Sequence, residues 1–273
     1  MQASAPMNNT WREALDALDA YLAAKGCLPS TIRLRRLHAA HLARDFPEAP
    51  WTLTTGQLLA WLRSHEWDRS TVRSYRSTLS TLYAAGVASG LTVADPTSGF
   101  PAMKGKRPAP HPTPDDVLDA ALERATEREA LILLLAARCG LRRGEIAQVR
   151  GDDVIRAPGG WCLIVRGKGD KQRTVPIGDD IARAITLRGQ GWAFPGDDGG
   201  HLSPDWVGVM ASRILPGRWT LHSLRHRYAT RAFAGTSDLL TVQRMLGHAS
   251  VATTQGYVDV PDDAMRRAML AAS

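Results

Sequence analysis

Six prolines between residues 95 and 114 restrict the fold of this 273-residue chain more than any other feature does. A proline fixes its own φ and has no backbone N–H, so we expect no regular structure in this stretch. The sequence therefore predicts a proline-rich basic linker over residues 95–112. It separates one domain over residues 8–94 from a second domain over residues 113–273.

The pattern before the linker predicts four short helices with arginine-rich polar faces. Thr10, Ser30 and Ser70 are expected to cap the first, second and fourth helices, and the third spans about residues 57–64. Apolar residues recur at helical spacing in each, so the four helices would pack into a compact bundle. The basic residues of these faces and of the linker that could meet a polyanion are Arg33, Arg36, Arg69, Arg73, Arg76, Lys104 and Lys106.

After the linker, the pattern predicts a mainly α-helical domain with one small antiparallel sheet, an α+β fold. Thr113 is expected to cap its first helix, and the almost wholly apolar residues 129–139 form its central helix, which ends at Gly140. Residues 161–165 and 172–177 are predicted to be the strands of a hairpin with Lys168 at its tip. Further helices are expected over residues 181–187, 204–215, 223–234, 239–246 and 262–272.

Composition points to a polyanionic partner, because the chain carries a formal net charge of +7. Its three cysteines, Cys27, Cys139 and Cys162, are too scattered for a disulfide framework or a zinc site, so we expect a reducing compartment. No apolar run is long enough to cross a membrane, and the N-terminus has no secretion signal. The sequence therefore predicts a cytoplasmic protein without a membrane partner.

The side chains best able to take part in chemistry lie between His222 and Tyr257. His222 and Arg225 are three apart, so they share one face of a helix. An arginine fork can hold a phosphate, and a neighbouring imidazole can move a proton near neutral pH. Tyr257 offers a phenol that becomes a nucleophile only beside a base and positive charge. Taken singly, such residues are more often part of a solvated surface.

The order of several motifs changes this assessment. A turn over residues 140–145 and a hairpin tip over residues 167–171 precede His222, and His248 comes shortly before Tyr257. Together these motifs resemble the tyrosine recombinase (phage integrase) family across the whole second half of the chain. The short segment before the first predicted helix implies a compact form without an arm-binding N-terminal domain.

The resemblance implies that Tyr257 attacks a DNA phosphodiester and forms a 3′-phosphotyrosyl link with a free 5′-hydroxyl. Arg142 and Arg225 would hold the non-bridging phosphate oxygens. Because the link stores the ester energy, the reaction needs neither ATP nor a divalent ion, and no metal or other cofactor is expected. The tyrosines rejected as nucleophiles are Tyr21, Tyr75, Tyr83 and Tyr228, which all lie in predicted helices.

The resemblance also assigns the proton transfers. His222 would act as the general base, or as a phosphate donor when protonated, and His248 would hydrogen-bond the phosphate. Lys168 would protonate the departing 5′-oxygen, with Lys171 as the competing candidate. Glu145 would orient an arginine or cap its helix. His226 and Arg143 would be neighbours of the site without an assigned role.

For the whole protein, the resemblance implies a helical core-type DNA-binding domain followed by a catalytic domain. A homotetramer would act on two double-stranded recombination sites through a Holliday junction, with an accessory directionality factor as a possible further partner. The C-terminal helix over residues 262–272 would serve as an exchange helix, docked on its own domain or on the next protomer.

Three biological roles remain open within the family. Integration or excision of a phage or other mobile element is the first expectation, followed by resolution of chromosome or plasmid dimers and by DNA inversion. Two more distant alternatives are a monomeric type IB topoisomerase and a catalytically inactive DNA-binding relative. The second is disfavoured because all six core residues of the family pattern are present.

Overall fold

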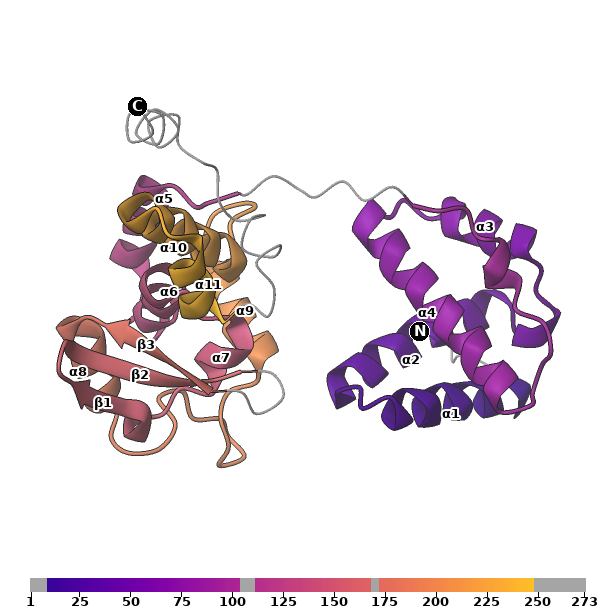
Figure 1. The fold of residues 1–273 in the computed structure, drawn as a ribbon, viewed down its shortest axis with the longest axis horizontal. Coiled ribbons are helices and arrows are strands. Elements are labelled where there is room, and N and C mark those ends of the chain that lie inside the picture. The colour runs from indigo at the N-terminus through magenta and orange to yellow at the C-terminus, as the bar shows by residue number, and fades with distance from the viewer. Residues whose placement is uncertain (1–8, 104–110, 168–171, 248–273) are drawn as a thin grey trace. The chain divides into compact units, whose positions relative to one another are not determined.

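The computed structural model describes residues 9–103, 111–167 and 172–247. The chain divides into two compact units, Met1–Gly105 and Lys106–Ser273, which we call the helical unit and the α+β unit (Figure 1). Each unit has its own hydrophobic core. Among the described residues, no helix is both long and apolar enough to span a membrane.

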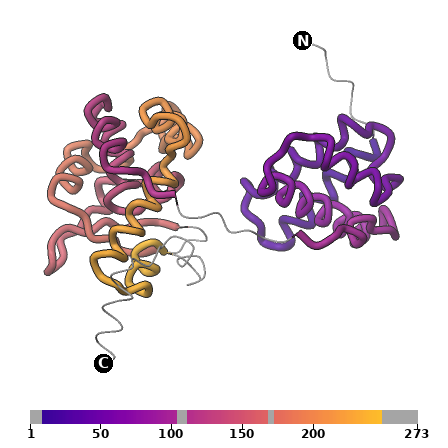
Figure 2. Tube along the Cα trace, turned by 90° about the horizontal axis from the view of Figure 1, so that it is seen from above, coloured from indigo at the N-terminus to yellow at the C-terminus, as the bar shows by residue number. Residues whose placement is uncertain are grey.

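The helices of the helical unit pack against one another (Figure 2). Their shared core includes Trp11, Leu42 and Tyr83. The Trp11 indole donates to the Phe46 carbonyl at 2.7 Å, and the Tyr83 hydroxyl donates to the Pro50 carbonyl at 2.6 Å, so both buried aromatics satisfy their polar ends. The elements of this unit are α1 (Asn9–Ala24), α2 (Pro29–Asp45), η1 (Pro50–Thr52), α3 (Thr55–Ser64), α4 (Arg69–Ala88) and η2 (Pro96–Gly99).

Three predicted caps in this unit are wrong. Thr10 lies inside α1 rather than at its cap. Ser30 lies inside α2, because Pro29 occupies the first helical position, where its fixed φ suits the helix and its missing N–H costs nothing. Asp68, not Ser70, caps α4, and its carboxylate accepts from the backbone N–H three residues on.

The proline-rich stretch contains more regular structure than predicted. Its first residues form the short 3-10 helix η2, which packs against α4 and α3. The side chain of Asp95 accepts from the backbone N–H of Thr97 at 2.8 Å, and Thr97 is buried. Proline suits the first position of such a turn because no N–H is needed there. Lys104 and Lys106 lie outside the described residues.

The α+β unit confirms the predicted fold, which is mostly helical with one small antiparallel sheet. Its strands are β1 (Val154–Ala157), β2 (Gly160–Arg166) and β3 (Gln172–Ile177), in the order β1-β2-β3. Its helices are α5 (Asp115–Arg124), α6 (Glu127–Cys139), α7 (Arg143–Ala147), η3 (Gly151–Asp153), α8 (Asp179–Thr186), α9 (Pro204–Ile214), α10 (Leu221–Thr236) and α11 (Leu239–Leu246).

The predicted pairing of the two longer strands is confirmed, with Leu163 opposite Val175. Strand β1 was missed, because it is a short edge strand without a clear alternation of buried and exposed residues. Thr113 was expected to cap α5, but Pro114 occupies that position. Instead, the Thr113 hydroxyl is 2.8 Å from that of Ser223, which links the segment before α5 to α10.

Helix α6 is the central element of this unit, as its apolar sequence predicts. It packs against α10, α8, α9 and β3, and a reciprocal capping box between Thr126 and Glu129 starts it. Gly140 ends it with a φ of 65°, in the left-handed region that favours glycine. A Cβ added at Gly140 would overlap the ring of Tyr228 and lie 3.1 Å from Leu246. The close approach of α6, α10 and α11 therefore requires glycine here.

We predict that Gly140→Ala destabilises the α+β unit by about 2–4 kcal/mol, because it combines left-handed strain with overpacking. Gly235→Ala is the matched control: Gly235 lies in α10 with no heavy atom within 4 Å of an added Cβ. That variant should be unchanged or slightly more stable. Urea unfolding of both variants measures the difference, and equal stabilities would contradict this account of the α6 end.

Candidate active site

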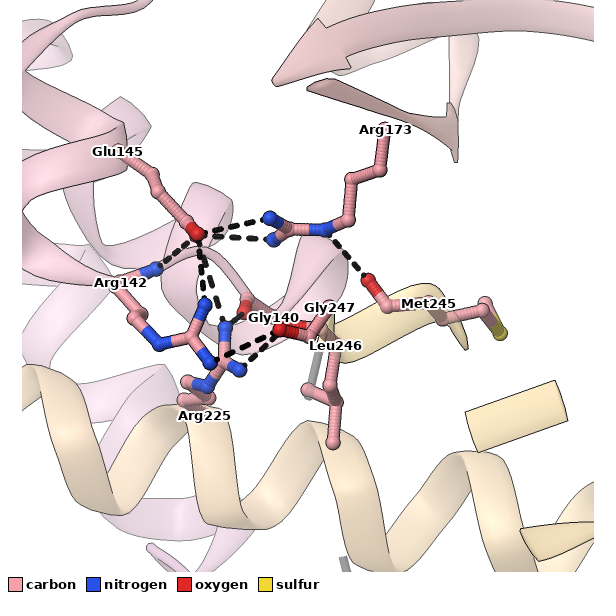
Figure 3. Close-up of polar contacts among 8 residues, drawn as sticks. All are labelled: Gly140, Arg142, Glu145, Arg173, Arg225, Met245, Leu246 and Gly247. Atoms are coloured by element: carbon pink, nitrogen blue, oxygen red, sulfur yellow. Dashed lines mark hydrogen bonds and ion pairs between the residues drawn. The ribbon is translucent and has the colours of Figure 1, made fainter. Parts of the chain in front are cut away.

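Three arginines from distant parts of the α+β unit converge on the carboxylate of Glu145 (Figure 3). Arg142 Nη1 lies 2.8 Å from Oε1, and the backbone N–H of Arg142 donates to Oε2 at 2.8 Å. Arg173 places Nη1 2.8 Å from Oε1 and Nη2 2.9 Å from Oε2. Arg225 Nη1 lies 3.7 Å from Oε2. Glu145 therefore both orients arginines and caps α7.

Arg173 is a residue that the sequence analysis missed. Besides its two contacts with Glu145, its Nε–H donates to the carbonyl of Met245 near the end of α11 at 2.9 Å. Gly247 packs so closely on this guanidinium that an added Cβ would lie 3.0 Å from Nη1. The sequence feature that could have identified Arg173 is its position two residues before the buried Val175, because this spacing puts its charge on the inward face of β3.

The electrostatics of this cluster depend on Glu145, whose side chain is only 5% exposed. Burial by itself would raise the pKa of the Glu145 carboxyl. The hydrogen bonds and charge of Arg173, the Arg142 N–H and the charge of Arg225 outweigh burial and lower the pKa of Glu145 below its ordinary value. The carboxylate is therefore ionised at neutral pH and partly neutralises the arginines around it.

Arg142, His222 and Arg225 line one pocket of about 750 Å³. The pocket is formed by the start of α7, one side of α9 and the first turn of α10. The side chain of Arg142 is 43% exposed, whereas that of Arg225 is 1% exposed. An anion entering from solvent would therefore meet Arg142 before it reaches the more enclosed Arg225.

Backbone carbonyls fix the position of Arg225. Its Nη1 donates to Gly140 at the end of α6, and its Nη2 donates to Leu246 at the end of α11 at 2.7 Å. Gly247 extends this pattern, since its carbonyl lies 3.4 Å from Arg142 Nη2. The C-terminal ends of two helices, where carbonyls carry partial negative charge, thus hold the guanidinium groups in place.

His222 lies in the first turn of α10, whose reciprocal capping box joins Thr220 and Ser223. Burial, followed by the charges of Arg225 and Arg142, lowers the pKa of His222 below 6.5. His222 is therefore neutral at pH 7 and able to accept a proton. One turn further on, burial and the neighbouring His222 lower the pKa of His226 to about 4.

The remaining residues of the predicted site are Lys168, its competitor Lys171, His248 and Tyr257, and all four lie outside the described residues. The last described residue before His248 is Gly247, whose carbonyl contacts Arg142 as stated above. The roles assigned to these four residues outside the described part of the chain stay predictions. The tyrosines that the sequence analysis rejected lie in α1, α4 and α10.

The basic residues selected in the helical unit differ in their surroundings. Arg36 pairs with Asp16 and Asp19 of α1 at 3.2 and 2.6 Å, so its charge is partly neutralised within the unit. Arg76 donates to the carbonyl of Pro101, and its guanidinium lies over the ring of Phe100. The selected arginines that are exposed are Arg33, Arg69 and Arg73.

Comparisons with known proteins identify the family of this chain. The model of the phage integrase family matches residues 114–263. A tyrosine recombinase XerC from Mycobacterium sp. (strain KMS) is 32% identical over 285 residues, covering 90% of this chain and 93% of that protein. A tyrosine recombinase XerC from Rhodospirillum centenum (strain ATCC 51521 / SW) is 34% identical over 183 residues, covering 58% of this chain and 53% of that protein.

Among solved structures, a lambda integrase(75-356) dimer bound to a COC′ core site has a similar fold. The TM-score is 0.72 at 22% identity, covering 91% of this chain and 95% of that chain. The chain belongs to the phage integrase family of tyrosine recombinases, whose members are DNA breaking-and-rejoining enzymes. The resemblance inferred from the sequence motifs is confirmed.

We predict that Glu145→Gln destabilises the α+β unit by about 3 kcal/mol at pH 7, because it leaves Arg173 and Arg225 without a compensating charge. The folded-state pKa of Glu145 is lowered, so its stabilisation is complete above the unfolded value of 4.5 and is lost as pH falls through the folded value. The gap between variant and wild type should therefore shrink below about pH 4.5.

Denaturant unfolding between pH 3 and pH 8 measures this gap, with the exposed Glu123→Gln on α5 as the matched control. The control should stay within about 0.5 kcal/mol of wild type throughout. A Glu145→Gln loss that is the same at every pH would show that the carboxylate charge does not stabilise the cluster.

Proposed function

We propose that this protein is a site-specific DNA recombinase that cleaves and rejoins DNA through Tyr257. The observation that carries the proposal is the pocket in which Arg142, Arg225 and the neutral His222 meet, in a chain of the phage integrase family. Two guanidinium groups and the first turn of a helix offer a site for one phosphodiester.

The arginines supply charge stabilisation. During attack on phosphorus, negative charge grows on the non-bridging oxygens, and preorganised positive groups aimed at these oxygens lower the barrier. Arg142 and Arg225 are preorganised by Glu145 and by the helix-end carbonyls, so they need little rearrangement when DNA binds. Removing one such donor costs roughly 3–4 kcal/mol of transition-state stabilisation in comparable enzymes.

The proton transfers complete the cycle. His222 accepts the proton of Tyr257 as the phenolate attacks, and His248 hydrogen-bonds the phosphate. Lys168, or Lys171 in its place, protonates the departing 5′-oxygen. The products are a 3′-phosphotyrosyl link and a free 5′-hydroxyl, and attack by a 5′-hydroxyl from another strand reverses the step with no net change in bond type.

The DNA partner is a double-stranded recombination site, bound by both units. The exposed Arg33 of α2 and the exposed Arg69 and Arg73 of α4 fit contacts to backbone phosphates. Arg36 fits this role less well, because two carboxylates of α1 already pair with it. The lambda integrase neighbour was solved as a dimer on a core site, which supports a DNA-bound assembly here. We further propose a tetramer on two sites, with an accessory directionality factor as an optional partner.

Two relatives named tyrosine recombinase XerC favour one biological role. One of them matches along nine-tenths of both chains, which supports resolution of chromosome dimers. Integration of a mobile element, the first expectation from the sequence, stays a prediction and is the alternative role. Both roles use the same strand exchange, so the chemistry above does not depend on this choice.

We predict that Tyr257→Phe forms no covalent adduct with site DNA but binds it with unchanged affinity, since only one oxygen is lost. Tyr228→Phe is the matched control, because burial raises the pKa of Tyr228 to about 12 and makes it a poor nucleophile. A denaturing gel with labelled DNA detects the adduct. An adduct that persists in Tyr257→Phe would mean that another residue is the nucleophile. In a separate assay, strand exchange between two labelled duplexes would exclude a type IB topoisomerase.

We predict that protonation of His222 makes the cleavage rate fall at acidic pH, which gives the pH–rate profile an acidic limb. Because the pKa of His222 is lowered below 6.5, the rate should be constant from pH 7 to pH 8 and should fall in acid as the imidazole gains a proton. His222→Gln should slow cleavage about a hundredfold and remove that limb. Single-turnover cleavage rates measure both effects. A wild-type rate that rises in acid would show instead that His222 acts as a protonated donor.

A further inference from the structure

Four aromatic rings of the helical unit form a continuous stack. The rings of His65, Trp67, Tyr75 and His38 follow one another with centroid separations of 4.0 Å at each step. His41 meets this stack edge-on, with centroids 5.2 Å from His65 and 5.8 Å from Tyr75. The stack fixes the side-chain orientations of His38 and His65, which come from different elements.

His41, His65 and Asp45 bring their ligand atoms together beside this stack, all within 4.8 Å of one another. His41 and Asp45 lie one helical turn apart on α2, so they share a face, and His65 directly follows α3. His65 Nε2 lies 4.0 Å from Asp45 Oδ2. Spacing along the sequence does not reveal this group, because His65 comes from a different element than His41 and Asp45.

A second layer of hydrogen bonds prepares these three groups. His65 Nδ1–H donates to the carbonyl of Trp61 at 2.9 Å, which leaves Nε2 with its lone pair. His41 Nδ1 lies 2.8 Å from the hydroxyl of Tyr75, so Nε2 is its remaining ring nitrogen. The Trp61 indole donates to Asp45 Oδ2 at 2.6 Å. Metal-binding histidines usually make such a bond through the other ring nitrogen.

We propose that His41 Nε2, His65 Nε2 and one carboxylate oxygen of Asp45 bind a divalent transition-metal ion, with zinc the best-fitting one. Two imidazoles and one carboxylate form a ligand set that zinc accepts, and a water would complete a tetrahedron. Zinc–ligand distances of about 2.0–2.2 Å place tetrahedral ligands roughly 3.4 Å apart. The ligand atoms lie within 4.8 Å of one another, so they need to close by up to about 1.4 Å. Imidazole ligands disfavour magnesium and calcium, which prefer oxygen.

The ion would cross-link α2 to the connection between α3 and α4. This role belongs to the helical unit, whereas the pocket that carries the proposed cleavage belongs to the α+β unit. The proposed metal site is therefore independent of the proposed function, and the failure of one proposal would not contradict the other. Because the ligands assemble only in the folded unit, binding would raise the thermal stability of that unit.

Isothermal titration of the untagged, reduced full-length protein with zinc chloride tests the proposal. We expect one equivalent bound, with affinity at least about tenfold weaker in Asp45→Asn and in His65→Gln. His38→Gln is the matched control, because His38 belongs to the same stack but not to the ligand set. It should bind zinc like the wild type, and excess magnesium should not compete.

Cobalt(II) gives a second readout that distinguishes these ligands from the cysteine thiols. The bound ion should show visible d–d absorption without the thiolate charge-transfer band that Cys27, Cys139 or Cys162 would produce. Saturating zinc should raise the unfolding midpoint by at least about 4 °C in the wild type and not in Asp45→Asn.

Three results would overturn the proposal: no heat of binding, affinity unchanged in both ligand variants, or a thiolate band. Asp45 is exposed and lies at the end of α2, so Asp45→Asn is expected to fold, which its circular dichroism spectrum checks. If His65→Gln alone failed to fold, the Asp45→Asn titration would still decide the outcome.

Discussion

The α+β unit depends on one buried carboxylate. Glu145 contacts the guanidinium groups of Arg142, Arg173 and Arg225, and a buried arginine without such a partner would cost several kcal/mol. The carboxylate cancels part of this charge, and backbone carbonyls at the ends of α6 and α11 satisfy further N–H groups. These contacts, drawn in Figure 3, let the positive charge of Arg142 and Arg225 face a pocket without destabilising the domain around it.

The same interactions bring together segments that lie far apart in the sequence. Gly140 ends α6, Arg173 lies on β3 and Leu246 ends α11, and all three take part in the network around Glu145. Gly247, the residue directly before the predicted His248, contacts Arg142, and Arg173 near the start of β3 shares Glu145 with the arginines that line the pocket.

The sequence predicted the features that depend on periodicity and on local motifs. The apolar run of α6, the pairing of β2 with β3 and the shared face of His222 and Arg225 all follow from spacing alone. Helix starts were less predictable, as Ser70 shows. Several nearby side chains can cap a helix, and which of them does so depends on where the backbone enters the helix. Arg173 and the partners of His41 were missed because those contacts form only after distant segments pack together.

A double-mutant cycle between Glu145 and Arg173 tests the central claim, that these two residues act together to hold the pocket arginines. The rate of covalent adduct formation on site DNA is compared for Glu145→Gln, Arg173→Met, the double variant and the wild type. We predict that the double variant is little slower than the slower single variant, with a coupling energy of at least about 1 kcal/mol. Strictly additive losses in adduct formation would contradict the account.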